Sequence, residues 1–347
     1  MQLEVKRVNN DKVMQAFLAI PSRVYGEMDI PPWAAASTMR SMFNVLLNPG
    51  LKHIEYANFV AFDGNQPVGR ITAAIDSLNP RIGEGFWGSF ECIDSTEVAA
   101  ELLETAAGWL REKKKNVMLG PATLNTNQYV GLLIKGFESE VYKEIPYNPP
   151  YYQNLVESTG LVKAHDLECY KWHLPETLPN ALQMGHKLEG VIIRPINYFN
   201  FIKEAKIIQE LYNKIFPKMW GFLPITHGDA QAMVLGLVNS VPPDLFLIAE
   251  VHRKPAGIHL AIPHKKPQRD RSGGKVRLAI GGVMPEFRKK GLHRLMLKEC
   301  YKQCRKLGLV TGEVSQVTES NDVKSKIISP IIGKEITKIY RVYKKDL

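Results

Sequence analysis

The sequence has few cysteines, and its histidines and cysteines lack the spacing of a metal site. Its 347 residues contain four cysteines, of which Cys300 and Cys304 lie four residues apart in a helical pattern. That spacing allows a metal site or a redox pair, but two small core residues are the simpler interpretation. We therefore expect no bound metal.

Long hydrophobic runs are also absent. No window approaches the about 18 uninterrupted apolar residues of a membrane helix, so we expect no membrane span and no membrane partner. The first residues, MQLEVKRVNNDKV, lack the apolar core of a secretion signal. Together with the low cysteine content, this predicts a reduced, cytoplasmic protein.

Positive charge is concentrated in one half of the chain. Residues 1–180 carry 16 Lys and Arg against 21 Asp and Glu, whereas residues 181–347 carry 29 against 14. The second half is therefore strongly basic, which predicts an anionic partner for it. Nucleic acid, acidic lipid and a phosphorylated cofactor all fit this charge.

The two halves repeat one order of predicted elements: strand, two helices, hairpin, strand, helix, strand. Gly69 and Gly257 occupy matching places 188 residues apart, and Gly120 and Gly312 match at 192 residues. This repetition predicts a duplicated domain. We expect domains at 1–175 and 191–347, joined by a polar, proline-containing linker at 176–190.

The stretch VMPEFRKKGLHRLML, residues 283–297, places three basic residues before a predicted helix. Basic side chains at a helix start are unfavourable unless an anion lies among them, because the helix dipole is positive there. Gly291 would let such a ligand approach the backbone. The spacing alone fits both a pyrophosphate site and a solvated basic loop.

This stretch resembles the signature of the GNAT superfamily of acyl-CoA-dependent N-acyltransferases, V-x-P-x-x-[QR]-x-x-G-x-[GA]. Val283, Pro285, Arg288 and Gly291 match it, and His293 stands where Gly or Ala is usual. The matching order of elements extends the resemblance to both halves. It implies an α/β (α+β) fold of two tandem GNAT-like domains, each a mixed, mostly antiparallel sheet flanked by helices, similar to an uncharacterised bacterial branch.

The resemblance also implies a cofactor, acetyl-CoA or another acyl-CoA, and the residues that would hold it. The backbone of Val283 and Met284 would pair with the pantetheine arm. The pyrophosphate would be wrapped by Arg288, Lys289, Lys290, Gly291, Leu292 and His293, with His293 crowding the phosphates or donating a hydrogen bond to them. Asn321 matches a family Asn that touches the cofactor, whereas Ile328 replaces the Tyr that family members often use as general acid.

The equivalent turn of the first copy is acidic. Glu91, Asp94 and Glu97 stand where the second copy has Arg and Lys, and Asp94 with Glu97 forms a capping-box pattern. Such a turn would repel a pyrophosphate. We therefore expect the first domain to be degenerate and the second to hold the cofactor.

Candidates for catalysis and acceptor binding are fewer. Transfer to an amine needs a base, and Glu313, at the end of a predicted strand, is the first candidate, although a surface or capping carboxylate is the alternative. Substrate contacts are expected from Trp220 and Phe222 in a helix–helix connection, and from Asn125, Asn127 and Tyr129 in a polar stretch that a plain turn would also explain.

Three functions remain open. The first is an enzyme that moves an acyl group from coenzyme A to the amine of a small molecule or protein. The second is a protein that binds acyl-CoA without transferring it, which the missing Tyr favours. The third, favoured by the basic second half, is a tRNA-dependent aminoacyl transferase-like enzyme.

Overall fold

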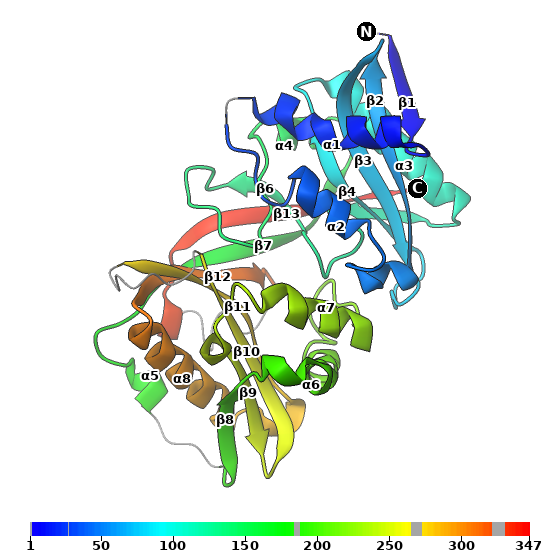
Figure 1. Ribbon diagram of the computed structural model, residues 1–347. Helices are drawn as coiled ribbons and strands as arrows, with labels where there is room; N and C mark the ends of the chain where they lie inside the picture. Colours follow the sequence, from blue (N-terminus) through cyan, green and yellow to red (C-terminus); the bar gives the residue numbers. More distant parts are fainter. Residues whose placement is uncertain (1, 27, 184–187, 265–272, 321–329) are drawn as a thin grey trace. The chain divides into compact units, whose positions relative to one another are not determined.

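The computed structural model describes residues 2–26, 28–183, 188–264, 273–320 and 330–347. The chain forms two compact units (Figure 1). Unit 1 comprises Met1–Leu167 with Lys338–Leu347, and unit 2 comprises Glu168–Thr337. The predicted α/β fold is confirmed: in each unit, helices flank a mixed and mostly antiparallel sheet.

Unit 1 contains a sheet in the order β1-β2-β3-β4-β5-β13. Its elements are β1 (Leu3–Arg7), α1 (Asp11–Tyr25), α2 (Ala36–Met42), β2 (Ile54–Asp63), β3 (Gln66–Asp76), β4 (Glu84–Cys92), α3 (Thr96–Glu112), β5 (Val117–Gly120), β6 (Leu132–Lys135), α4 (Tyr152–Glu157), the first half of β7 (Val162–His173) and most of β13 (Ile336–Asp346).

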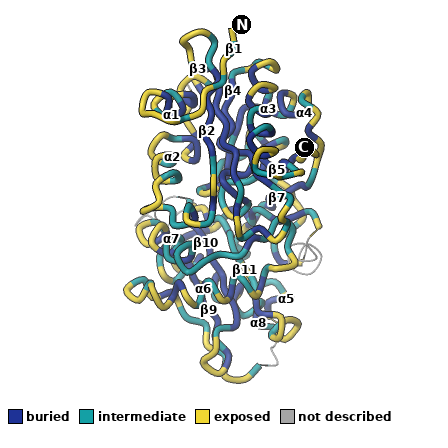
Figure 2. The backbone as a smooth tube through the Cα atoms, turned by 90° about the vertical axis from the view of Figure 1, so that its right-hand side faces the viewer, coloured by how far each residue is buried: buried dark blue, intermediate teal, exposed yellow. Residues whose placement is uncertain are grey.

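Helices cover both faces of the sheet in unit 1. A Cβ on Gly69 of β3 would touch Leu102 and Val98 of α3. The next residue, Arg70, donates to the carbonyl of Phe17 in α1 at 3.0 Å. Because successive strand residues point to opposite faces, α3 and α1 lie on opposite sides of the sheet. Figure 2 accordingly shows the central strands buried and the outer turns of the helices exposed.

Unit 2 has a sheet in the order β12-β11-β10-β9-β8. Its elements are α5 (Asn180–Gln183), β8 (Val191–Pro195), the 3₁₀ turn η2 (Tyr198–Asn200), α6 (Phe201–Ile215), α7 (His227–Leu237), the 3₁₀ turn η3 (Pro243–Leu245), β9 (Phe246–Val251), β10 (Lys254–Pro263), β11 (Gly274–Val283), the 3₁₀ turn η4 (Pro285–Phe287), α8 (Leu292–Lys306) and β12 (Leu309–Thr318).

The same layering recurs in unit 2. A Cβ on Gly257 of β10 would meet Met296 of α8, whereas a Cβ on Gly282 of β11 would meet Ile215 of α6 and the following Phe216. One face of the sheet therefore carries α8 and the other carries α6. Cys300 and Cys304 are buried on α8, with sulfur atoms 3.9 Å apart, in the core of this unit.

The last strand of the chain returns to unit 1. Tyr343 of β13 pairs with Gly120 of β5, and Asp346 pairs with Val117. Residues 338–347 thus belong to unit 1 by contact, whereas the expected boundaries assign them to the second copy. The expected domains, 1–175 and 191–347, and the linker at 176–190 refer to the sequence duplication and not to units of contact, so they stay a prediction. Among the described residues, no helix is long and apolar enough to cross a membrane.

Candidate functional site

The signature stretch forms the connection between β11 and α8. The amide of Met284 donates to the carbonyl of Ala256 at 2.8 Å, which fixes the end of β11 against β10. After η4, Gly291 adopts the left-handed conformation (φ 93°) as the N-cap of α8, and no side chain among the described residues caps the helix there. The first amides of α8 are therefore available for an anion.

The basic residues of this turn have different surroundings. Arg288 donates from Nη2 to the carbonyl of Ile215 at 2.7 Å and from Nε to that of Val283 at 3.4 Å. It ties the turn to the end of α6. Lys289 and Lys290 are exposed, with the Lys290 ammonium 6.0 Å from the centre of the Phe287 ring. These lysines are accessible to an anion at the start of α8.

Beside this turn, β11 and β12 lose their pairing. The parallel ladder runs from Gly274–Leu309 to Leu278–Val314. Beyond it, residues 279–283 and 315–318 continue as strands without further pairing between these two strands in the described part of the chain. The amide of Met284 and the carbonyl of Val283 are already bonded, to Ala256 and Arg288, so the expected role of this backbone in holding the pantetheine arm stays a prediction.

His293 points back onto the sheet. Its Nε2 lies 3.3 Å from the position of a Cβ on Gly281, and the ring of His259 approaches the same position at 3.5 Å. Burial lowers the pKa of His293 to about 4, and burial together with the charge of His293 lowers that of His259 to about 3. Both imidazoles are neutral at pH 7, and within the described part of the chain the buried Nδ1 atom of each has no hydrogen-bond partner. The sequence did not indicate that His259 lies near His293, because the two residues are 34 positions apart in the chain.

Glu313 lies in the middle of β12. The strand runs on to Thr318, so the expectation that Glu313 ends it is wrong. Its carboxylate is 1% exposed and accepts a hydrogen bond from Thr337 Oγ1 at 3.1 Å. In the parallel strand register, Glu313 of β12 lies opposite Arg277 of β11, one position before the pairing of these strands ends. Its catalytic role stays a prediction.

The expected acceptor residues fall into two groups. Trp220 and Phe222 lie in the connection between α6 and α7, which begins beside the end of β11, and Phe222 stacks on Tyr212 with ring centres 5.9 Å apart. Asn125, Asn127 and Tyr129 belong to unit 1.

The unit 1 group has local structural contacts. Asn125 donates to Asp76 at 2.8 Å and accepts from the amide of Asn127 at 3.0 Å, as in a side-chain-stabilised turn. Tyr129 contacts Trp33, with ring centres 6.1 Å apart. Asn321 and Ile328 lie outside the described residues.

The first copy has a shorter connection at the equivalent place. In the strand register, Cys92 lies opposite Gly69 in unit 1, and Val283 lies opposite Gly257 in unit 2. The next residue makes the same backbone hydrogen bond in both units: the amide of Ile93 donates to the carbonyl of Val68, and the amide of Met284 donates to that of Ala256. Three residues separate β4 from α3, whereas eight separate β11 from α8. The segment that precedes Gly291 therefore has no counterpart in unit 1.

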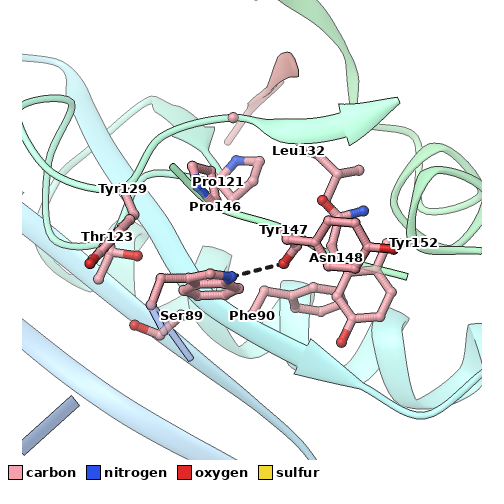
Figure 3. A pocket seen from close by; sticks show the side chains of 12 residues that line it. Ser89, Phe90, Pro121, Thr123, Tyr129, Leu132, Pro146, Tyr147, Asn148 and Tyr152 are labelled. Carbon is pink, nitrogen blue, oxygen red and sulfur yellow. Dashed lines mark hydrogen bonds between the residues drawn. The ribbon is translucent and has the colours of Figure 1, made fainter. Parts of the chain in front are cut away.

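The end of β4 is also satisfied by side chains of unit 1. The amide of Cys92 donates to the Tyr152 hydroxyl at 2.8 Å, and the Tyr151 hydroxyl donates to the Cys92 carbonyl at 2.8 Å. Nearby, a recess with a cavity volume of about 20 Å³ is lined by Phe90, Tyr147 and Tyr152 among others (Figure 3). That space holds about one water molecule.

The sequence suggested that Glu91 is part of an acidic helix start, and the structure shows that it is not. Its side chain is fully buried and accepts hydrogen bonds from Tyr25 at 3.2 Å and Tyr152 at 2.6 Å. Burial raises its pKa to about 7 although the buried Arg70 opposes this. The helix is capped by Ser95, whose Oγ accepts from the amide of Val98, so the capping box predicted at Asp94 is wrong.

Known proteins resemble this chain in sequence and in fold. Protein YghO of Escherichia coli K12 is 34% identical over 267 residues, which are 75% of this chain and 68% of that protein. A protein named bacterial ceramide synthase, from Caulobacter vibrioides, is 27% identical over 99% of this chain and 98% of its own. No family model matches.

Among solved structures, a tandem GNAT protein from the clavulanic acid biosynthesis pathway superposes with a TM-score of 0.57 at 11% identity, covering 99% of this chain and 98% of its own. Its fold has the two tandem domains that the repeated element order predicted. The chain belongs to the family of protein YghO, and its fold is similar to that of the tandem GNAT protein.

Proposed function

We propose that the protein is an acyl-CoA-dependent N-acyltransferase and that unit 2 holds the cofactor. The observation that carries this proposal is the turn from Met284 to Leu292, where an uncapped helix start, a left-handed glycine and two exposed lysines coincide. These groups suit a pyrophosphate: amides bind it, and lysines neutralise it. Acyl-CoA, when bound, supplies an acyl group activated as a thioester.

The proposal assigns no cofactor to unit 1. The shorter connection before α3 lacks the segment that would surround a pyrophosphate. Tyr151 and Tyr152 already bond the backbone of Cys92, the counterpart of Val283. Both observations favour a degenerate first copy.

Glu313 is our candidate for the base that takes the amine proton, through a water molecule. The imidazoles of His259 and His293 also lie close to the end of β11. The Glu313 carboxylate is held in place by the Thr337 hydroxyl. His293 would act by fixing the start of α8 against the sheet.

The relative named bacterial ceramide synthase suggests a class of substrate. Because it aligns with 99% of this chain, we propose the chemistry in its name: a fatty acyl group transferred to the amine of a long-chain amino alcohol. A protein that only binds acyl-CoA is the second candidate, since Ile328 stands where the usual general acid would be.

A binding and activity test separates these candidates. Native mass spectrometry and calorimetry with acetyl-CoA and palmitoyl-CoA measure binding, and release of free thiol in the presence of sphinganine or small amines measures transfer. Gly291→Glu should abolish binding, because it places a carboxylate at the helix start. Gly160→Glu is the matched control, since Gly160 also has a positive φ (82°) and no heavy atom within 4 Å of an added Cβ.

Full affinity in a folded Gly291→Glu variant would place the cofactor elsewhere. Tight binding without thiol release for any amine tested would favour the binding protein.

A further inference from the structure

One end of the α6–α7 helix pair in unit 2 exposes large apolar side chains. Phe199 of η2 is fully exposed, and Ile202 of α6 is 57% exposed. On α7 and the residue after it, Leu235 is 50% exposed and Val238 is 41% exposed. We call these four residues the apolar end.

Hydrogen bonds place the four residues at the same end of the helix pair. The Tyr198 hydroxyl donates to the carbonyl of Val241 at 3.0 Å, which joins the start of α6 to the segment after α7. At the other end, Asn213 bonds the backbone of Ile225, just before α7 begins. The helices are therefore antiparallel, and the start of α6 lies beside the end of α7.

The charge around the apolar end is mainly positive. Lys203 and Lys206 are exposed on the first turns of α6. The neighbouring Glu204 is 3% exposed and is ion-paired with Arg194 at 2.8 Å, so it adds no free negative charge to the surface. Asp244, on the following turn, is half-buried.

We propose that the apolar end docks onto the surface of an anionic lipid bilayer. An exposed aromatic and three aliphatic side chains would enter the headgroup region, while the two lysines contact lipid phosphates. A protein partner fits less well, because protein–protein interfaces are depleted in lysine. The proposal departs from the expectation of no membrane partner and does not depend on the proposed enzymatic function.

Vesicle sedimentation of the full chain tests this proposal. Vesicles of phosphatidylcholine mixed with phosphatidylglycerol should bind the protein more tightly than phosphatidylcholine alone. The double variant Phe199→Ser, Ile202→Ser should lose binding at least about tenfold, because it removes most of the inserted apolar surface. Lys203→Gln with Lys206→Gln should lower affinity about tenfold, and only for the anionic vesicles. Ile82→Ser, at an 81% exposed position of unit 1, is the control and should change nothing.

Three results would overturn the proposal: no vesicle binding by the wild type, an equal loss in the Ile82→Ser control, or concentration-dependent self-association that the Phe199→Ser, Ile202→Ser variant abolishes. The last result would make the apolar end an interface between copies. Coenzyme A binding is measured without lipid, so failure of one proposal leaves the other standing.

Discussion

The neutral histidine pair beneath the signature turn should make unit 2 sensitive to mild acid. The pKa of His259 is about 3 in the folded chain, far below the 6.5 of an unperturbed histidine. As pH falls below 6.5 the unfolded state therefore binds a proton that the folded state rejects, and the free energy of unfolding decreases. The decrease continues until the pH approaches the folded pKa.

The size of this effect follows from the pKa shift. Each pH unit below 6.5 costs about 1.4 kcal/mol per rejected proton, so at about pH 5 His259 alone should cost about 2 kcal/mol. His293, whose pKa is about 4, adds to this, although it is only half-buried. Because His293 lies in the first turn of α8 and His259 lies near it, the loss should appear first in that helix.

Urea unfolding and hydrogen exchange of α8 peptides, at about pH 7 and about pH 5, measure the effect. In His259→Gln, a neutral side chain of similar length should remove roughly half of the pH dependence while keeping the fold. His252→Gln, at an exposed turn of the β9–β10 hairpin, is the matched control and should behave as the wild type. An unchanged pH dependence in His259→Gln would contradict this prediction, because it would mean that the folded protein does not exclude a proton from the His259 imidazole.

Three further predictions concern other buried groups. Glu91→Gln should destabilise unit 1 by about 1–3 kcal/mol, because it removes the buried carboxyl group that accepts hydrogen bonds from Tyr25 and Tyr152, and thermal unfolding checks this. Gly312→Ala should prevent stable folding of unit 2, because its Cβ would lie 1.7 Å from the Val276 carbonyl oxygen; circular dichroism and proteolysis report the outcome. Glu313→Gln should lower the maximal rate about 10²–10⁴-fold with little change in cofactor affinity, and unchanged steady-state kinetics would make Glu313 a bystander.

Local patterns predicted the local elements well. Asn10 caps α1 by accepting from the amide of Val13 at 3.0 Å, and the β2–β3 hairpin closes at Asp63 and Gln66 as expected. Such features depend on residues a few positions apart, which the sequence presents directly. The cap at Ser95 instead of Asp94 shows the limit, because backbone conformation decides which of two adjacent residues caps a helix.

Features that depend on distant residues could not be predicted in this way. Glu91 is buried because Arg70 and Tyr152, 21 and 61 positions away, surround its carboxylate. The sequence alone left two roles for His293, crowding the phosphates or donating a hydrogen bond to them, and it gave no sign that the ring would lie near Gly281 and His259. Residue type and spacing carry no information on such orientations, which arise from strand register and helix packing.

The contrast between the two copies explains why the basic residues stand where they do. Both copies end their fourth strand with the same backbone bond, from Ile93 to Val68 and from Met284 to Ala256. After that bond, unit 1 goes almost directly into a side-chain-capped helix, whereas unit 2 inserts five more residues and begins an uncapped helix at a left-handed glycine. An uncapped helix start flanked by lysines costs stability unless an anion binds there. Unit 2 has the uncapped helix start flanked by lysines, whereas tyrosines bond the end of the equivalent strand in unit 1. This difference is the one expected if a single anionic cofactor binds, and binds to unit 2.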